Sequence, residues 1–413
     1  MRTDRSSSAL HRRVSDQAAS ISADSFVSKY ATGRRLAALT TIQVVGYGLL
    51  YYASLVALPR ISAETGWSFF SVSAALSGSM VVSAAAAIPI GRYLDKTGPR
   101  TTMIVGTVVG AAGLVVVGIA MHLAVLFLGF MMLGLAMAST LYGVAFTTIT
   151  HRYQGNRNRP LVILTIAAGF ASTIFAPVMA WLIEQSGWRA AFVLIAAAYL
   201  VTCVPLVLAS MERRWDLPAQ HRHDQSWLAI RKIVLTGRFG RLMFATLAIA
   251  VGLYTATVNA VPLFEERGYT YEAAAWGLGI IGAGQVLGRF LFYVVPGRRI
   301  PWVQLVTTGA VSSLLLFFLG AVAAPFLVVA VIAFLAGAGR GAMTLVDATA
   351  VSDRWGTANY GAINGILHAP IAVLLGLTPA LGVLLADTLG SFAAMAMAMA
   401  GIAALGALVG RWT

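Results

Sequence analysis

Charged residues are scarce in this sequence: they make up 11% of its 413 residues, whereas apolar residues make up 59%. Soluble globular domains carry about 25% charged residues, so this scarcity excludes an ordinary water-soluble enzyme or binding protein. A lipid bilayer is the solvent that fits the composition. We therefore expect an all-α membrane protein, because a helix satisfies its own backbone hydrogen bonds within lipid.

Cysteine is nearly absent as well, since Cys203 is the only one. A single thiol can form neither a disulfide within the chain nor a cysteine-based metal site. The few His, Asp and Glu residues are scattered along the apolar regions instead of clustered, which argues against an integral membrane enzyme. We expect no catalytic activity, no metal site and no cofactor.

Long apolar runs fill most of the chain. A helix needs roughly 20 apolar residues to cross the hydrocarbon core, and such stretches follow one another along the sequence. Glycine and alanine recur inside them, for example at Gly129, Gly134 and Ala138, and allow membrane helices to pack closely. We expect twelve transmembrane helices at about 35–58, 71–91, 101–120, 123–150, 160–183, 188–210, 240–264, 272–296, 302–321, 325–350, 359–384 and 388–410.

The net charge of +14 does not indicate a nucleic-acid partner, because the basic residues lie in short segments between the apolar runs. If these segments alternate between the two sides of the membrane, Arg60, Arg189 and Arg267 lie on one side. Arg289 and Arg340 fall within spans, and every other Lys and Arg lies on the opposite side. Basic residues accumulate on the cytoplasmic side of membrane proteins. This pattern predicts an inner (plasma) membrane protein with both termini in the cytoplasm.

The two halves of the apolar region resemble each other. Arg152 matches Arg354 and Pro177 matches Pro379, each at an offset of 202 positions. Such repeats are typical of transporters that bind substrate near the midplane, between two pseudo-symmetric bundles. We expect a disordered cytoplasmic tail at 1–33, a six-helix bundle at 34–210, a cytoplasmic loop at 211–239 and a second six-helix bundle at 240–413.

One loop carries a specific motif. After the second apolar run the sequence reads Gly91-Arg92-Tyr93-Leu94-Asp95-Lys96-Thr97-Gly98-Pro99-Arg100. This resembles the cytoplasmic loop signature of the major facilitator superfamily, G-x-L-x-D-(R/K)-x-G-x-(R/K). The resemblance implies the major facilitator fold for everything after the tail, and a transporter that works by alternating access.

The residue types in this motif suit a gate. Gly91 would allow close helix packing, and Gly98 would permit a tight turn that brings Arg100 back beside Asp95. The resemblance implies that Asp95 pairs with a basic residue at the end of the fourth span, for which Arg152 is the candidate. The alternative is that these basic residues only anchor the loop on the cytoplasmic side.

Charged residues inside spans are functional candidates, because each costs about 2.5–3.5 kcal/mol at mid-helix on insertion scales. This sequence has three: Arg289, Arg340 and Asp347. Arg289 shares a helix face with Gln285, four residues earlier. A guanidinium in a low-dielectric cavity offers a planar fork that matches a carboxylate, so an anionic substrate is expected.

Three stretches resemble the monocarboxylate porter branch of this superfamily, including its oxalate/formate-type bacterial relatives. They are Leu58-Pro59-x-Ile61-x-x-Glu64-Thr65-Gly66-Trp67-Ser68, Pro177-x-x-x-Trp181-Leu182-Ile183-Glu184-x-x-Gly187-Trp188-Arg189, and the region around Arg289. The resemblance implies that Arg289 binds the substrate carboxylate, that Gln285 assists it, and that Tyr142 faces the substrate.

Further polar residues could complete the site. Tyr47 and Tyr51 share one helix face, and so do Asn364 and His368, so either pair could line a cavity. Packing or interhelical hydrogen bonding is the alternative role for both pairs. Gln285 cannot titrate, so a coupled proton would need another carrier. Asp347 beside Arg340 is the candidate pair, with a purely structural ion pair as the alternative.

These observations predict a secondary active transporter that moves a small, monocarboxylate-like organic anion through the bilayer, as a monomer and with a proton symported through Asp347 if one moves. A drug or cation efflux antiporter of the same superfamily is the main alternative. Such exporters usually have an acidic residue at depth in the first half, and spans one to six have none. The alternative of another class is a non-transporting membrane receptor or sensor.

Overall fold

The computed structural model describes residues 33–152, 158–211, 227–294, 300–356 and 360–413. Nearly all of the predicted tail, and most of the predicted loop at 211–239, lie outside these ranges. Every regular element within them is helical, which confirms the all-α prediction. The elements are η1 (Tyr47–Tyr52), α2 (Ala53–Thr65), α3 (Phe69–Gly118), α4 (Leu123–Thr140), α5 (Tyr142–Arg152), α6 (Asn158–Ala168), α7 (Ala171–Ser210), α8 (Trp227–Val234), α9 (Gly237–Val258), α10 (Ala260–Glu266), α11 (Tyr271–Val294), α12 (Pro301–Ala321), α13 (Phe326–Thr349), α14 (Ser352–Trp355), α15 (Tyr360–Leu389) and α16 (Phe392–Gly410).

Ten helical segments of the described chain are long and apolar enough to cross a membrane. Two of them are too long for a single crossing: Phe69–Gly118 has 50 residues and Arg159–Ser210 has 52. At 1.5 Å per residue each would extend about 75 Å, against about 30 Å of hydrocarbon. Each contains one glycine in a left-handed conformation, Gly98 (φ 79°) or Gly187 (φ 75°), where the chain turns back. Divided at these glycines, the ten segments would give twelve spans, the number predicted.

The first span extends further than its predicted end at residue 58. The helix continues through Pro59 to Thr65. It ends at Gly66, whose φ of 72° suits glycine and whose N–H donates to the carbonyl of Ser62. The next helix then begins at once, because the Ser68 side chain accepts a hydrogen bond from Ser71 N–H at 3.1 Å. Glycine and a serine cap therefore set this boundary, and proline does not.

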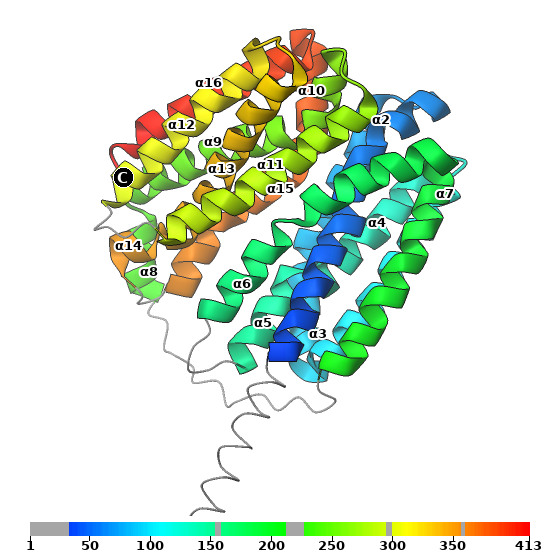
Figure 1. The fold of residues 1–413 in the computed structure, drawn as a ribbon. Helices are drawn as coiled ribbons and strands as arrows, with labels where there is room; N and C mark the ends of the chain where they lie inside the picture. The colour runs from blue at the N-terminus through cyan, green and yellow to red at the C-terminus, as the bar shows by residue number, and fades with distance from the viewer. Residues whose placement is uncertain (1–32, 153–157, 212–226, 295–299, 357–359) are drawn as a thin grey trace, which may run out of the picture.

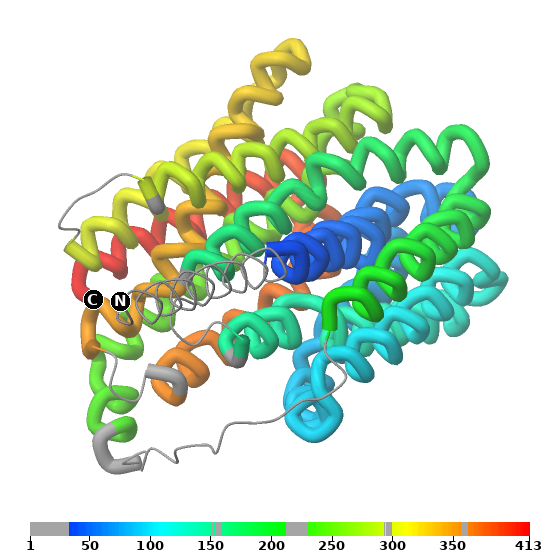
Figure 2. Tube along the Cα trace, turned by 60° about the horizontal axis from the view of Figure 1, so that its bottom comes forward, coloured from blue at the N-terminus to red at the C-terminus, as the bar shows by residue number. Residues whose placement is uncertain are grey.

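Figure 1 shows two groups of helices, one from η1 to α7 in blue to green and one from α9 to α16 in green to red. Figure 2 shows the same long helices running roughly parallel. The groups meet chiefly where α3 packs on α15 and where α7 packs on α11. We interpret the groups as the two predicted bundles, 34–210 and 240–413.

One end of the molecule, here named the closed end, joins the two groups. Arg60 of α2 lies 3.8 Å from Glu265 of α10, and its guanidinium lies 4.1 Å above the ring of Tyr271. The Tyr271 hydroxyl donates to the carbonyl of Val56 at 2.8 Å. These contacts connect α2 to α10 and α11, so they hold the first six spans against the last six.

The other end, here named the basic end, carries Arg92, Arg100, Arg241, Arg354 and Arg411. The contacts found there hold each group together. Arg241 donates to the carbonyl of Trp412 at 2.9 Å, and Arg354 donates to the Thr413 hydroxyl at 2.8 Å. Arg100 donates to the carbonyl of Met211 at 3.4 Å within the first group.

Candidate functional site

A cavity of about 540 Å³ lies between the two groups of helices. Its walls come from η1, α3, α4, α5 and α6 of the first group and from α9, α11, α13 and α15 of the second. The volume lies within the range of small-molecule sites, about 300–1,000 Å³. Of the described residues that line it, two are arginines and none is acidic. The cavity is therefore positively charged at neutral pH.

Arg289 lies in this cavity, as predicted from its place in the eighth span. Its side chain is only 6% exposed, and its Nη1 donates to the carbonyl of Thr165 at 2.5 Å. Thr165 lies in the last turn of α6, where the helix dipole attracts a cation, and its carbonyl also accepts from the N–H of Gly169 at 3.2 Å. Tyr142 of α5 lines the same cavity as Arg289. The ion pairs found for the described residues lie elsewhere, so no carboxylate of the described residues neutralises Arg289.

Glycines allow α11, the helix that carries Arg289, to pack closely against α13. A Cβ on Gly284 or Gly288 of α11 would lie 1.9 Å from a backbone oxygen of α13, and a Cβ on Gly341 of α13 would lie 2.0 Å from the carbonyl oxygen of Gln285. Only glycine permits this backbone contact. Gly169 is similar, since a Cβ there would lie 2.7 Å from Val286 of α11. The base of Arg289 is therefore held by close contacts on two sides.

Arg340 of α13 is the second cation in the cavity. Its side chain is 4% exposed, and its guanidinium lies 4.0 Å above the ring of Tyr254 in α9. Its Nη1 donates to the Thr257 hydroxyl at 3.1 Å. The sequence interpretation placed Arg340 with Asp347, but the structure directs it toward α9 and the cavity.

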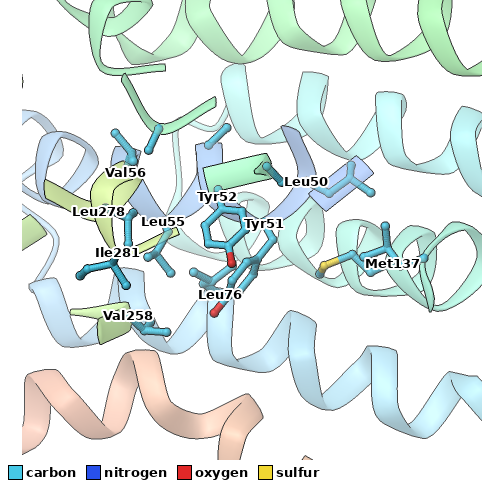
Figure 3. Close-up of a cluster of buried hydrophobic side chains, with 14 of the residues drawn as sticks. Leu50, Tyr51, Tyr52, Leu55, Val56, Leu76, Met137, Val258, Leu278 and Ile281 are labelled. Atoms are coloured by element: carbon cyan, nitrogen blue, oxygen red, sulfur yellow. The ribbon is translucent and has the colours of Figure 1, made fainter. Parts of the chain in front are cut away.

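Tyrosines form much of the wall around these cations. Tyr47 and Tyr51 line the cavity as predicted, and Tyr52 lines it as well. All three belong to η1, a π-helical segment. Its wider turn brings residues i and i+5 onto one face, so Tyr52 joins Tyr47. The Tyr47 ring lies 4.7 Å from that of Tyr142. Figure 3 shows the hydroxyls of Tyr51 and Tyr52 pointing toward the same side of η1.

The structure does not bring every predicted site residue to the cavity. Gln285 lines it, one turn from Arg289. Asn364 and His368 of α15 are not among the lining residues, although Ala372 and Gly376 of the same helix are. The Nδ1 of His368 lies 3.0 Å from the carbonyl oxygen of Asn364, its own helix neighbour. In this conformation the pair lies outside the lining of the cavity.

Asp347 is half-buried, and its buried Oδ1 has no hydrogen-bond partner among the described residues. It lies seven residues after Arg340 on α13, about 10 Å along the helix axis. The predicted Arg340–Asp347 ion pair is absent from the described residues, because Arg340 turns to Tyr254 and Thr257. Asp347 does not line the cavity.

The motif of the basic end is formed in part. Gly98 has the turn conformation that we predicted, with a φ of 79°. No close helix contact is found at Gly91 among the described residues, because nothing beyond its own helix lies within 4 Å of where its Cβ would be. Asp95 is half-buried, and its pairing with Arg152 stays a prediction.

At the closed end, arginines do have acidic partners. Besides the Arg60–Glu265 contact, Arg189 lies 2.6 Å from Glu64. Burial raises the pKa of Glu265 above its usual value, although the nearby Arg60 opposes the shift. In the part of the chain that the structure describes, no three His, Cys, Asp or Glu side chains come together as metal ligands would.

Sequence reasoning missed several cavity residues. Tyr52 was missed because its approach depends on a π-helical turn, which no local sequence pattern announces. Tyr254 and Gly169 were missed because neither is charged nor part of a motif. Arg340 was noticed for its charge, and its buried position in a span was the signal that could have assigned it to the cavity.

Comparisons with known proteins agree with this architecture. A family model described as Major Facilitator Superfamily matches residues 40–322. Monocarboxylate transporter 13 of Rattus norvegicus is 26% identical over 69% of this chain and 68% of its own length. A gallate transporter of Pseudomonas putida is 27% identical over 83% of this chain and 85% of its own length. A multidrug resistance protein of Klebsiella pneumoniae is 26% identical over 53% and 57%.

A solved structure shares the fold. The crystal structure of a bacterial homolog of the human lysosomal transporter Spinster, in an inward-facing and unoccupied conformation, has a TM-score of 0.67 at 18% identity. The match covers 92% of this chain and 94% of that one. It therefore extends beyond residue 322, where the family match ends, into the last spans.

Proposed function

Since the chain belongs to the Major Facilitator Superfamily, we propose that it is a secondary active transporter that moves a small organic anion across the inner membrane by alternating access. One observation carries the choice of an anion. Arg289 is buried in the central cavity, and no carboxylate of the described chain pairs with it. A bound carboxylate would supply the missing negative charge.

The free energy of the buried Arg289 guanidinium favours a bound anion over an empty cavity. Leaving one partner of a buried ion pair uncompensated costs about 3–5 kcal/mol, and an arginine fork can bind a carboxylate through two parallel hydrogen bonds. Arg289 uses Nη1 for the Thr165 carbonyl, whereas its Nε has no partner. Donors are therefore available for a carboxylate, assisted by Gln285 and Tyr142 beside it.

The proposed transport cycle uses the contrast between the two ends. Here the Arg60, Glu265 and Tyr271 contacts hold the closed end together. We assign this conformation to the inward-facing state, with the basic end and both termini in the cytoplasm. In the outward-facing state the closed end would separate, and the Asp95 loop would close the basic end against Arg152.

The names of the relatives support an organic acid as substrate. Two of them are described as transporting monocarboxylates or gallate. The competing function is drug or cation efflux, for which one relative is named. The cavity disfavours cations, because its described lining has two arginines and no acid. Proton coupling is the finer part of the proposal, with Asp347 as the carrier because its buried Oδ1 has no partner.

A thermal-shift screen of the purified full chain tests the proposal. Small mono- and dicarboxylates and cationic drugs are compared at two pH values, since a ligand that binds the native state raises the melting temperature. We expect carboxylates to stabilise the protein and cationic drugs to have no effect. Stabilisation by cations alone would overturn the anion assignment, and carboxylate binding without flux into proteoliposomes would favour a receptor.

A further inference from the structure

We propose that Arg340 is a second substrate-binding cation, and that the substrate carries two acidic groups, one bound by Arg289 and one by Arg340. The inference rests on the proposed function, because it concerns the same cavity. It goes further by assigning a role to Arg340 and by naming a dianion as the chemical class of substrate.

The two arginines start close together and reach toward different walls. They come from α11 and α13, whose backbones meet where Gly341 lies against the carbonyl of Gln285. From there Arg289 reaches toward Thr165 of α6, in the first group of helices. Arg340 reaches toward Thr257 of α9, in the second group. One cavity thus presents a guanidinium on each of two sides.

Both cations are buried and incompletely satisfied. Each side chain is more than nine-tenths buried, and each has an Nε without a hydrogen-bond partner. One face of the Arg340 guanidinium lies against the ring of Tyr254, so the plane that contains its N–H donors is fixed. That geometry suits a planar acidic group.

Charge balance favours two negative charges. No acidic residue of the described chain lines the cavity, and the acid nearest to Arg340 on its own helix, Asp347, lies about two turns away. A monoanion would neutralise one guanidinium and leave the other buried with its charge uncompensated. A dianion would neutralise both.

Tyrosines line the same cavity as the two cations. Tyr52 and Tyr254 belong to its wall, and the Tyr254 ring lies 4.0 Å from the Arg340 guanidinium. They give the cavity aromatic walls. The expected ligand is therefore a flat or short molecule that bears an acidic group at each end.

The test compares matched ligands on the purified full chain at neutral pH. Benzoate is paired with the three benzenedicarboxylates and butyrate with succinate, and dissociation constants are measured by calorimetry. We expect at least one dicarboxylate to bind about tenfold or more tightly than its monocarboxylate partner, which corresponds to about 1.4 kcal/mol. The inference is overturned if every dicarboxylate binds no more tightly than its partner.

Variants of Arg340 test whether this residue causes the preference for dicarboxylates. Arg340→Gln should reduce the preference for the dicarboxylate to less than about twofold and leave monocarboxylate binding intact, whereas Arg340→Lys should keep part of the preference because it keeps the charge. Equal weakening of both ligands by Arg340→Gln would indicate a structural role and overturn the inference. Arg411→Gln, which changes an exposed arginine at the basic end, is the matched control.

The measurement in the unmodified chain does not depend on whether a variant folds. It also separates the two proposals. If monocarboxylates bind and dicarboxylates bind no better, only the second acidic group is refuted. If neither class binds, the organic-anion function fails together with this inference.

Discussion

The arginines of the cavity and those of the closed end differ in their partners. Arg60 and Arg189 at the closed end each contact a glutamate, at 3.8 Å and 2.6 Å, and are partly exposed. Arg289 and Arg340 are nearly fully buried and contact carbonyl, hydroxyl and aromatic groups instead. Among the described residues, the arginines of the closed end thus have acidic partners where water already screens the charge, whereas the buried arginines of the cavity have none.

This difference separates structural from functional charge. A partly exposed ion pair contributes about 0–1 kcal/mol, so the closed end can separate without a large barrier. A buried cation without an acid is unfavourable unless something else supplies the negative charge. The closed end therefore suits a reversible latch, and the cavity suits an anionic ligand.

The largest expected effect comes from exchanging one arginine in each region. Arg289→Gln should lower carboxylate uptake into proteoliposomes about 100-fold or more, because a charge-assisted bidentate contact is lost in a low-dielectric site. Arg189→Gln should change uptake less than about twofold, since its pair is exposed. Equal losses in the two variants would remove the distinction between the regions.

Two glycines test whether the packing beneath Arg289 is specific. Gly288→Ala places a Cβ about 1.9 Å from the Ala338 carbonyl oxygen, so α11 and α13 must separate. Overpacking of this kind costs about 1–3 kcal/mol, which should lower the melting temperature by several degrees. Gly91→Ala meets nothing within 4 Å and should leave the melting temperature unchanged or slightly raised. A tolerated Gly288→Ala would show that the contact is not required.

Loss of the latch should have an intermediate effect. Arg60→Gln removes both the Glu265 contact and the stacking on Tyr271, together worth about 1 kcal/mol. The population with a separated closed end should then rise about fivefold. Spin labels placed on α2 and α10 in a Cys203→Ser background would report it as a longer distance. An unchanged distance distribution would show that these contacts do not hold the closed end.

The smallest expected effect is a pH dependence of the same latch. Burial raises the pKa of Glu265 in the closed conformation, so that conformation binds the proton more tightly than a solvated one. Its proton-linked stability is present below the ordinary pKa and is lost as pH rises through the raised pKa. Acidification should therefore favour the closed end, by less than about threefold, and Glu265→Gln should abolish the dependence. A shift toward the separated form at low pH would contradict this sign.

The sequence was sufficient for the fold. The apolar runs predicted the helices, and the motif around Asp95 predicted the family, because both depend on local composition and spacing. Gly98 was correctly assigned to a turn for the same reason. The end of the first span was misplaced, since Pro59 is a weaker terminator there than Gly66, whose φ of 72° becomes visible only in the folded chain.

The cavity was predictable where a charge, a family motif or the spacing on a helix face marked its residues. Arg289, Gln285, Tyr142, Tyr47 and Tyr51 were all expected in the site, and all line the cavity. The direction of the Arg340 side chain could not be predicted, because the choice between Asp347 and Tyr254 depends on how α9 and α13 pack. The same limit applied to the Asn364 and His368 pair, whose helix lines the cavity one turn further along.

Direct binding shows most simply whether Arg289 binds the carboxylate of the substrate. Calorimetric titration of the purified full chain with the tightest-binding carboxylate should show one saturable site, and Arg289→Gln should abolish the signal while the protein remains monodisperse. Undiminished binding by Arg289→Gln would contradict the account.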